Sequence, residues 1–226
     1  LREWLTTVGC HHTGSYRHCL FVAGFAVAYA QHLGMREDDQ RRLARAALLH
    51  DVGKAFIPVA ILDKPGPLTL EEMEEMRQHP RRGYEALSAQ GGFPPEMLDV
   101  VLHHHEFLDG TGYPDGLSGN QISDIVRLTT IVDIYAALVE KRAYRLQFTH
   151  VKAFTMMEEM GDRLDPHLLQ AFRLDRHTVQ LRAMRFDQSR QLSGFEIVFR
   201  QGIIRREDAV LQREVEAGRR LAGARH

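Results

Sequence analysis

The sequence predicts a mainly α-helical domain followed by a small extension with at least one strand and a helix. Apolar residues recur at helical spacing through most of the first 175 residues. Helix-starting signals, such as acidic first turns and an opening proline, precede several of these segments. The only convincing strand signal covers residues 195–199. With 226 residues, the chain is long enough for one large domain plus an extension, or for two small domains.

Helices are expected in order along the first 175 residues. Residues 15–33 carry an apolar face at the spacing of an amphipathic helix. Residues 37–51 begin with acidic side chains, which the helix dipole favours in a first turn. Thr69 and Glu72 match a capping box, so a helix should start there, after a segment broken by two prolines. Further helices are expected over residues 94–106, 123–139 and 149–160, with a short one opening at residue 166.

After about residue 175 the pattern changes. Residues 207–224 predict a charged helix with a thin apolar stripe, which could be a dimer contact, a linker to another domain or a solvated end. We therefore expect an N-terminal segment over residues 1–14, the main domain over 15–175 and an extension of unknown role over 176–226. Because the chain begins at Leu1 rather than Met, we expect it to be excised from a longer protein, whose sensor domain or membrane anchor would lie elsewhere.

The composition is that of an ordinary soluble protein, with 44% hydrophobic and 26% charged residues. The 29 basic and 30 acidic residues nearly cancel, which argues against a nucleic-acid polymer as ligand. The longest nearly apolar run, residues 19–30, is too short to cross a bilayer, so no membrane segment is expected within the chain. Cys10 and Cys19 make a poor disulfide framework and favour a reducing cytosol.

Histidines and aspartates from several separate helices fall on faces predicted to be buried. His18 shares the apolar face of its helix, where a satisfied core histidine is by itself the commoner explanation. His50 and Asp51 close the next helix on its buried side, and Asp133 interrupts the apolar run 128–138. A buried charge is costly unless it is paired or bound to a metal. Taken together, five histidines and two aspartates directed inward from separate helices are hard to explain as structure alone: His18, His50, His79, His104, His105, Asp51 and Asp133.

Three adjacent histidines lie at the end of the helix expected over residues 94–106. On its 3.6-residue period, His104 falls on an apolar stripe and His105 lies beside it, whereas His103 falls on a mixed face. Histidine is the commonest metal-ligand side chain because its neutral ring binds metals at physiological pH. We therefore expect His104 and His105 to point inward and His103 to be more exposed.

Five segments carry a resemblance to a known family, in this order: LLHDVGK, ILDKPGPLT, EEMRQHP, HHEFLDGTGYPDGLSG and VDIYAAL. From about Tyr16 to Pro166 the chain resembles the HD-GYP family, a branch of the HD metal-dependent phosphohydrolases. The HHExxDGxGYP pattern is the most specific part of this match. The resemblance implies an HD-type helical bundle around a metal centre. It also implies a bacterial, cytoplasmic phosphodiesterase that hydrolyses cyclic di-GMP to the linear dinucleotide pGpG or on to GMP.

The resemblance further implies two divalent metal ions, expected to be iron or manganese, with a metal-bridging hydroxide as the nucleophile. A mixed set of imidazoles and carboxylates suits such first-row metals better than magnesium. Asp51 would bridge the two ions, and Lys54 would hold a non-bridging phosphate oxygen. The ligands implied for one ion are His18, His50, Asp51 and Asp133, and those for the other are Asp51, His79, His104 and His105.

Two other segments acquire expected roles from the resemblance. The loop with Gly112, Tyr113 and Pro114 would border the active site and contact a GGDEF domain, although it is equally explained as a stiff turn. Arg142 and Arg145 would bind phosphate or guanine through their forked donors, unless they are only a solvated helix end.

The sequence departs from the family pattern at three positions. Gly14 stands where many relatives carry a glutamate ligand, so we predict two metals rather than three unless His11 and His12 fold back over the site. Ala136 and Ala143 replace an aspartate and a proline of the family and put substrate handling in doubt. Two alternatives to an active cyclic di-GMP phosphodiesterase stay open. One is a non-catalytic module that binds cyclic di-GMP or a GGDEF partner, and the other is a phosphohydrolase of another cyclic dinucleotide or nucleotide.

Overall fold

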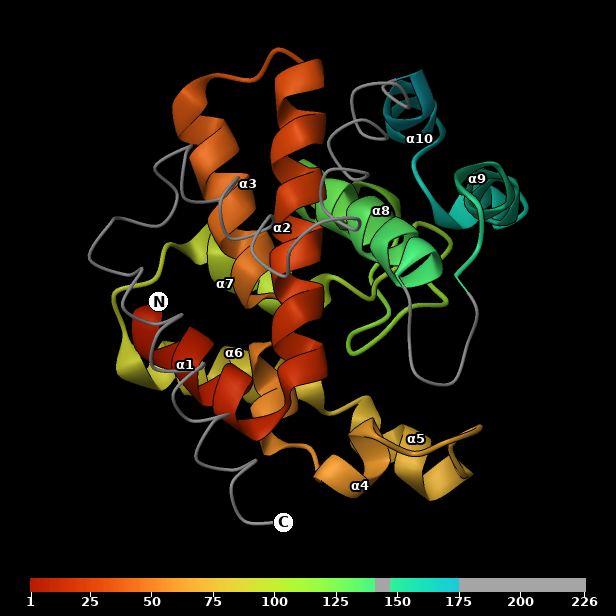
Figure 1. Cartoon of the computed structure of the whole chain (residues 1–226). Helices are drawn as coiled ribbons and strands as arrows, with labels where there is room; N and C mark the ends of the chain where they lie inside the picture. The colour runs from red at the N-terminus through yellow and green to blue at the C-terminus, as the bar shows by residue number, and fades with distance from the viewer. Residues whose placement is uncertain (141–146, 175–226) are drawn as a thin grey trace, which may run out of the picture.

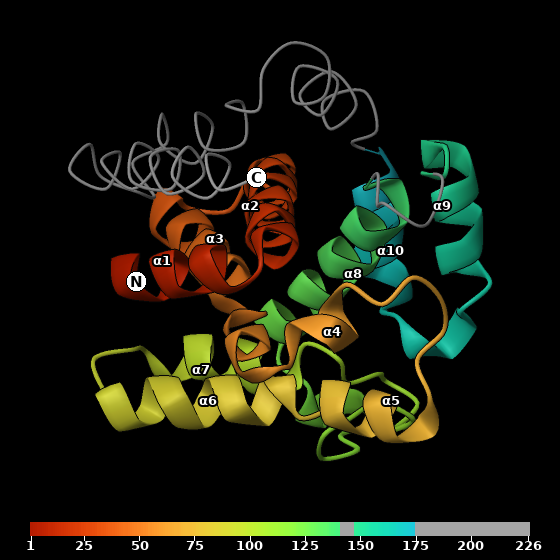
Figure 2. The same cartoon turned by 60° about the horizontal axis from the view of Figure 1, so that its bottom comes forward.

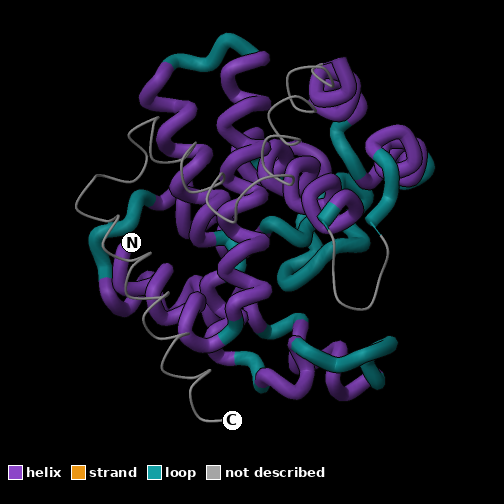
Figure 3. The backbone as a smooth tube through the Cα atoms, in the orientation of Figure 1, coloured by secondary structure: helices purple, strands orange, loops and turns teal. Residues whose placement is uncertain are grey.

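A computed structural model of the chain describes residues 1–140 and 147–174, which form a bundle of helices (Figures 1 and 3). Within these ranges there is no β-sheet, and the mainly α-helical fold expected from the sequence is confirmed. None of the described helices is both long and apolar enough to cross a lipid bilayer. Arg142, Ala143, Arg145, the strand expected over residues 195–199 and the helix expected over 207–224 lie outside the described residues.

The helices follow one another along the chain, with the loop of residues 104–118 between α7 and η2. The α-helices are α1 (Arg2–His11), α2 (Thr13–His32), α3 (Glu37–Leu49), α4 (Val59–Leu62), α5 (Leu70–Met76), α6 (His79–Gln90), α7 (Pro95–His103), α8 (Asp124–Val139), α9 (His150–Glu158) and α10 (Pro166–Leu174). Three 3-10 helices complete the set: η1 (Val52–Phe56), η2 (Gly119–Gln121) and η3 (Gly161–Arg163). The capping box expected at Thr69 and Glu72 starts α5.

The antiparallel pair of α2 and α3 forms the centre of the bundle (Figure 1). Small side chains are fully buried on both helices, among them Ala26 and Ala30 on α2 and Ala44 and Ala47 on α3. Because the alanine side chain is short, two helices that face each other with alanines can bring their axes close together. The pair therefore provides a rigid base for the residues at its ends.

The remaining helices pack around this pair. Helix α8 crosses α2, and an aromatic group joins α2, α8 and α10 through Phe25, Tyr29, Tyr135 and Phe172. Figure 2 shows α6 and α7 side by side below α3, and η1 contacts both α6 and α1. The N-terminal segment expected over residues 1–14 contains α1, whose Leu5 and Val8 belong to the same hydrophobic core as α2.

Two expected helices are shorter in the structure than their periodicity suggested. The helix expected over residues 37–51 ends at Leu49, and Asp51 lies between α3 and η1 with φ −98° and ψ 12°. The helix expected over residues 94–106 ends at His103. In both cases the residues expected to carry chemistry lie just beyond a helix end, where the backbone is free to turn a side chain toward another helix.

Candidate metal centre

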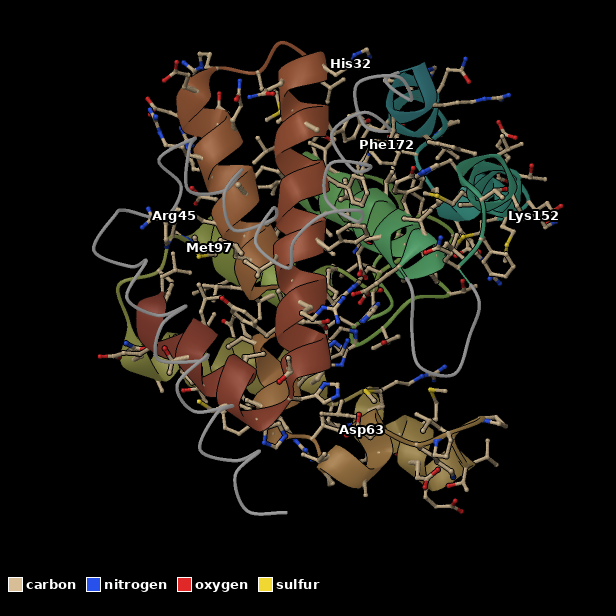
Figure 4. The ribbon with its side chains drawn as sticks, viewed as in Figure 1. His32, Arg45, Asp63, Met97, Lys152 and Phe172 are labelled. Atoms are coloured by element: carbon tan, nitrogen blue, oxygen red, sulfur yellow. The ribbon has the colours of Figure 1, made fainter. Side chains whose placement is uncertain are left out.

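Side chains from five separate parts of the fold converge beside the N-terminal half of α2, where Figure 4 shows many nitrogen-bearing side chains. His18 comes from α2, and Asp133 comes from the middle of α8. His50 and Asp51 follow α3, His79 begins α6, and His104 and His105 follow α7. Gly53 allows this convergence, because a Cβ atom there would lie only 1.8 Å from the carbonyl oxygen of His79. The structure thus brings together all seven residues expected to bind metal.

Asp51 lies at the centre of this cluster and is buried. Its Oδ2 atom lies 3.3 Å from Nε2 of His50 and 3.9 Å from Nε2 of His18. Its Oδ1 atom lies 3.2 Å from Nε2 of His79 and 3.8 Å from Nε2 of His104. Each carboxylate oxygen therefore faces a different pair of histidines.

The potential ligand atoms form two groups that share Asp51. In one group, atoms of Asp51, His79, His104 and His105 all lie within 4.8 Å of one another. In the other, atoms of His18, His50 and Asp51 do so as well. Asp133 adds a second carboxylate to this latter group, since its Oδ1 atom lies 2.7 Å from Nε2 of His18 and 3.6 Å from Nε2 of His50.

Backbone carbonyls orient three of the imidazole rings. Nδ1 of His50 donates a hydrogen bond to the carbonyl oxygen of Ala47, and Nδ1 of His79 donates one to the carbonyl oxygen of Met76. The nitrogen–oxygen distance is 2.7 Å in both. Nδ1 of His104 contacts the carbonyl oxygens of Val100 and Val101, both at 3.1 Å. A carbonyl only accepts a hydrogen bond, so Nδ1 must carry the proton in each ring. In the neutral form of each ring, the lone pair of Nε2 is then directed into the cluster, as metal ligation requires.

Two polar atoms at the centre of the cluster are buried and have no hydrogen-bond partner among the described residues: Nε2 of His50 and Oδ1 of Asp51. Buried polar atoms without a partner are rare in folded proteins, where an ion or a water molecule usually satisfies them. A divalent cation would satisfy both atoms, because imidazole nitrogen and carboxylate oxygen are its usual ligands. The buried cluster therefore suits divalent metal binding.

The electrostatics of the two groups are complementary to a cation. Burial lowers the pKa of His104 well below its usual value and that of His105 to about 3, so both rings are neutral. In the other group burial alone would lower the pKa of His50, but the negative charges of Asp51 and Asp133 beside the ring raise it to about 10. Positive charge is thus strongly favoured between these carboxylates, whether a proton or a metal ion carries it.

Lys54 lies at the solvent side of the cluster. Its Nζ atom lies 2.6 Å from Oδ2 of Asp51, and 19% of its side chain is exposed compared with 1% for Asp51. Burial alone would raise the pKa of Asp51, but the nearby charges of Lys54 and His50 hold it well below its usual value. Asp51 is therefore ionised, and Lys54 offers a partly exposed amino group to an anion that approaches from solvent.

The three adjacent histidines diverge. His104 is fully buried in the cluster. His103 points away from it, with Nδ1 at 2.7 Å from Asp99 and Nε2 at 3.1 Å from Asp115. His105 lies beyond the end of α7 and stacks on Tyr113, with ring centroids 4.7 Å apart. The direction expected for each ring agrees with the structure, although a turn rather than the helix positions His105.

The loop with Gly112, Tyr113 and Pro114 is organised by Glu106, whose part in the site the sequence did not reveal. The buried carboxylate of Glu106 accepts hydrogen bonds from the backbone N–H groups of Asp115, Gly116 and Leu117. A Cβ atom at Gly112 would lie 2.4 Å from Cα of Glu106, so only glycine fits there. The residues of the HHE motif therefore have two roles. His104 and His105 face the cluster, and Glu106 holds the loop whose Tyr113 stacks on His105.

Neither His11 nor His12 is directed into the cluster. Nε2 of His11 donates a hydrogen bond to the carbonyl oxygen of Ile57, at a nitrogen–oxygen distance of 2.8 Å. Nδ1 of His12 accepts from the backbone N–H of Ser15 and caps α2, while its Nε2 lies 3.0 Å from Asp63. A Cβ atom at Gly14 would lie 2.8 Å from the His12 ring, so the capping ring fills the space beside that glycine. Ala136 is fully buried in the core.

A second residue missed by sequence reasoning is Glu140, directly after α8. Its Oε2 atom lies 3.1 Å from Nδ1 of His18. No motif quoted for the family resemblance includes it, and the two residues are far apart in the sequence.

A family model described as an HD domain matches residues 6–168. The chain belongs to the HD domain family. The match spans every member of the cluster, from His18 on α2 to Asp133 on α8. The resemblance drawn from the sequence motifs is also confirmed, since the HD domain has curated relatives named as cyclic di-GMP phosphodiesterases.

Three relatives show the range of activities around this HD domain. It is 37% identical over 158 residues to a cyclic di-GMP phosphodiesterase of Pseudomonas aeruginosa, covering 70% of this chain and 38% of that protein. It is 42% identical over 152 residues to the cyclic di-GMP phosphodiesterase response regulator RpfG of Xanthomonas campestris. That match covers 66% of this chain and 39% of RpfG. A 3′3′-cGAMP-specific phosphodiesterase of Vibrio cholerae is 38% identical over 157 residues, which cover 69% of this chain and 34% of that protein. The chain thus spans less than half the length of these relatives.

A solved structure supports the fold. The HD domain of the phosphodiesterase PgpH from L. monocytogenes, in complex with cyclic-di-AMP, superposes with a TM-score of 0.60 at 18% identity. The superposition covers 83% of this chain and 98% of that one. At this identity the likeness establishes the shared helical architecture.

Proposed function

We propose that this chain is a metal-dependent phosphodiesterase domain that hydrolyses cyclic di-GMP. The observation that carries the proposal is the placement of the Asp51 carboxylate, whose two oxygens face two different sets of histidines. One carboxylate between two such sets is the arrangement expected of a bridging ligand in a two-metal site. Cyclic di-GMP is favoured as substrate because the cyclic di-GMP phosphodiesterases of P. aeruginosa and X. campestris are among the relatives.

The residues present fit a pair of first-row divalent cations, with iron or manganese proposed because the set mixes imidazoles with carboxylates. His18, His50, Asp51 and Asp133 would hold one ion. Asp51, His79, His104 and His105 would hold the other. When bound, such a pair supplies Lewis acidity, polarising phosphoryl oxygens and lowering the pKa of water.

In the proposed reaction, water forms a new bond to phosphorus and the bond from phosphorus to the 3′ oxygen breaks. That oxygen leaves with a proton, and one water is consumed for each phosphodiester bond. Cleavage of one bond produces pGpG, and cleavage of both produces GMP. Lys54 would contact a non-bridging phosphate oxygen, because its ammonium group lies beside Asp51 at the exposed side of the cluster.

Another cyclic dinucleotide is the second candidate substrate. It is favoured by the relative of V. cholerae named as 3′3′-cGAMP-specific and by the PgpH HD domain solved with cyclic-di-AMP. The Arg142 and Arg145 side chains, proposed to bind phosphate or guanine, would contribute to this choice. A GGDEF-domain partner at the loop of Gly112, Tyr113 and Pro114, and a homodimer, stay predictions.

The test is a turnover assay on protein loaded anaerobically with Mn(II) or Fe(II), run in parallel with cyclic di-GMP, 3′3′-cGAMP and cyclic-di-AMP. We expect the fastest loss of cyclic di-GMP, with pGpG or GMP appearing on chromatography. Faster turnover of another dinucleotide would reassign the substrate. Binding without turnover would reassign the chain as a regulatory module. Lys64→Met is a matched control for Lys54→Met, because Lys64 also pairs with a carboxylate, that of Glu72, outside the cluster.

A further inference from the structure

We propose that Glu140 is a positioning residue that orients His18 for metal binding. The proposal rests on the proposed metal-dependent function and extends it to a residue outside the expected ligand set. The carrying observation is the 3.1 Å contact between Oε2 of Glu140 and Nδ1 of His18. The opposite ring nitrogen, Nε2, faces Asp133 at 2.7 Å and Asp51 at 3.9 Å.

The two nitrogens of His18 therefore have separate tasks. Only Nε2 faces the carboxylates of the cluster, so it is the nitrogen able to bind a cation there. A carboxylate only accepts hydrogen bonds, so Asp133 and Glu140 each favour a proton on the nitrogen that they face. With a cation bound at Nε2, Glu140 would hold the remaining proton on Nδ1 and leave the lone pair of Nε2 to the cation. Because Glu140 contacts the far side of the ring, it acts through His18 and is not itself placed as a ligand.

His18 differs in this respect from three other histidines of the cluster. His50, His79 and His104 each direct Nδ1 to a backbone carbonyl within four residues in the sequence. His18 instead uses a side chain that follows the last turn of α8. The positions differ as well: His18 lies within α2, whereas His50 and His104 follow a helix end and His79 begins a helix. The partner of the His18 ring comes from another element, the end of α8.

The negative charge of Glu140 would also strengthen His18 as a ligand, in addition to orienting its ring. A carboxylate bonded to the far nitrogen of a metal-bound imidazole makes the ring more basic and fixes its angle. The side chain of Glu140 is only 15% exposed, so water screens the interaction little. Loss of such a partner typically weakens metal affinity by about 10- to 100-fold.

The experiment compares Glu140→Ala and Glu140→Gln with Asp99→Ala. The last variant is the matched control, because Asp99 holds Nδ1 of His103 at 2.7 Å in the same way but His103 points away from the cluster. Zn(II) affinity is measured by competition with a chelator, without substrate. We expect Glu140→Ala to lose about 10- to 100-fold in affinity. Glu140→Gln should lose less, because its amide oxygen still accepts from Nδ1, and Asp99→Ala should match the unmodified protein.

A second readout separates positioning from a general loss of structure. In Zn(II)-loaded protein labelled with ¹⁵N-histidine, we expect His18, assigned with a His18→Gln variant, to carry its proton on Nδ1. That signal should persist in Glu140→Gln and be lost or broadened in Glu140→Ala. Affinity in Glu140→Ala equal to that of Asp99→Ala would overturn the proposal, as would an unchanged His18 signal. Intact metal binding without hydrolysis would overturn only the proposed function, whereas absence of metal binding would overturn both.

Discussion

Tyr113 stacks on His105, with ring centroids 4.7 Å apart and ring planes at 23°. This contact joins the loop of Gly112, Tyr113 and Pro114 to the cluster directly. His105 lies beyond the end of α7 and has no neighbouring helical turn to hold it. The loop therefore contributes to the candidate metal centre itself, beside any role in recognising a partner.

We predict that Tyr113→Leu weakens metal binding while Tyr113→Phe retains it. The phenylalanine ring preserves the stacking on His105, whereas leucine leaves that ring free to rotate. The energy of such a ring pair is about 0.5–1.5 kcal/mol, so the affinity should fall by about 2- to 12-fold. Metal content after dialysis against a chelator measures the effect. Equal losses in the two variants would assign the role to the hydroxyl group instead.

We predict that Asp51→Asn abolishes turnover and lowers metal content in both groups of ligands. An amide is neutral and a poor bridge, and each oxygen of Asp51 faces its own pair of histidines. Elemental analysis and the turnover assay, applied to the purified variant, measure the two effects. The control is Asp162→Asn in η3, an exposed position. Full activity of a metal-replete Asp51→Asn protein would be incompatible with a bridging role.

The three adjacent histidines should separate in the same assays. His104→Ala and His105→Ala are expected to lose metal and activity, because both rings belong to the cluster. His103→Ala should lose little of either, because its nitrogens face Asp99 and Asp115. If His103→Ala were the most damaging of the three, the assignment of ligands along the chain would be displaced by one residue.

We predict two metal ions per chain rather than three. Gly14 has no side chain, and the nitrogens of His11 and His12 are engaged by Ile57, Ser15 and Asp63. The double variant His11→Ala/His12→Ala should keep the metal content of the unmodified protein. Its free energy of unfolding should fall by about 1 kcal/mol, because α2 loses its N-terminal cap. A third equivalent that disappears in this variant would show that these histidines do bind metal.

Local sequence patterns determined the helices and the family. The capping box of Thr69 and Glu72 acts within one turn, and helical periodicity depends only on nearby residues, so both could be recognised without a structure. The ordered motifs from LLHDVGK to VDIYAAL likewise indicated an HD-GYP domain. Periodicity also separated His104 from His103, although it extended α7 past the residue at which the helix ends.

Only the tertiary structure decided how these residues meet. Glu140 reaches His18, and Glu106 binds the backbone of the loop at residues 115–117, through contacts that neither segment encodes alone. The separate directions of the two Asp51 oxygens likewise depend on α2, α6 and α7 surrounding one residue. Helix propensity and motif spacing follow from short-range interactions along the chain. The partner of a buried polar atom is instead set by the packing of distant elements, which bury it and leave few atoms able to satisfy it.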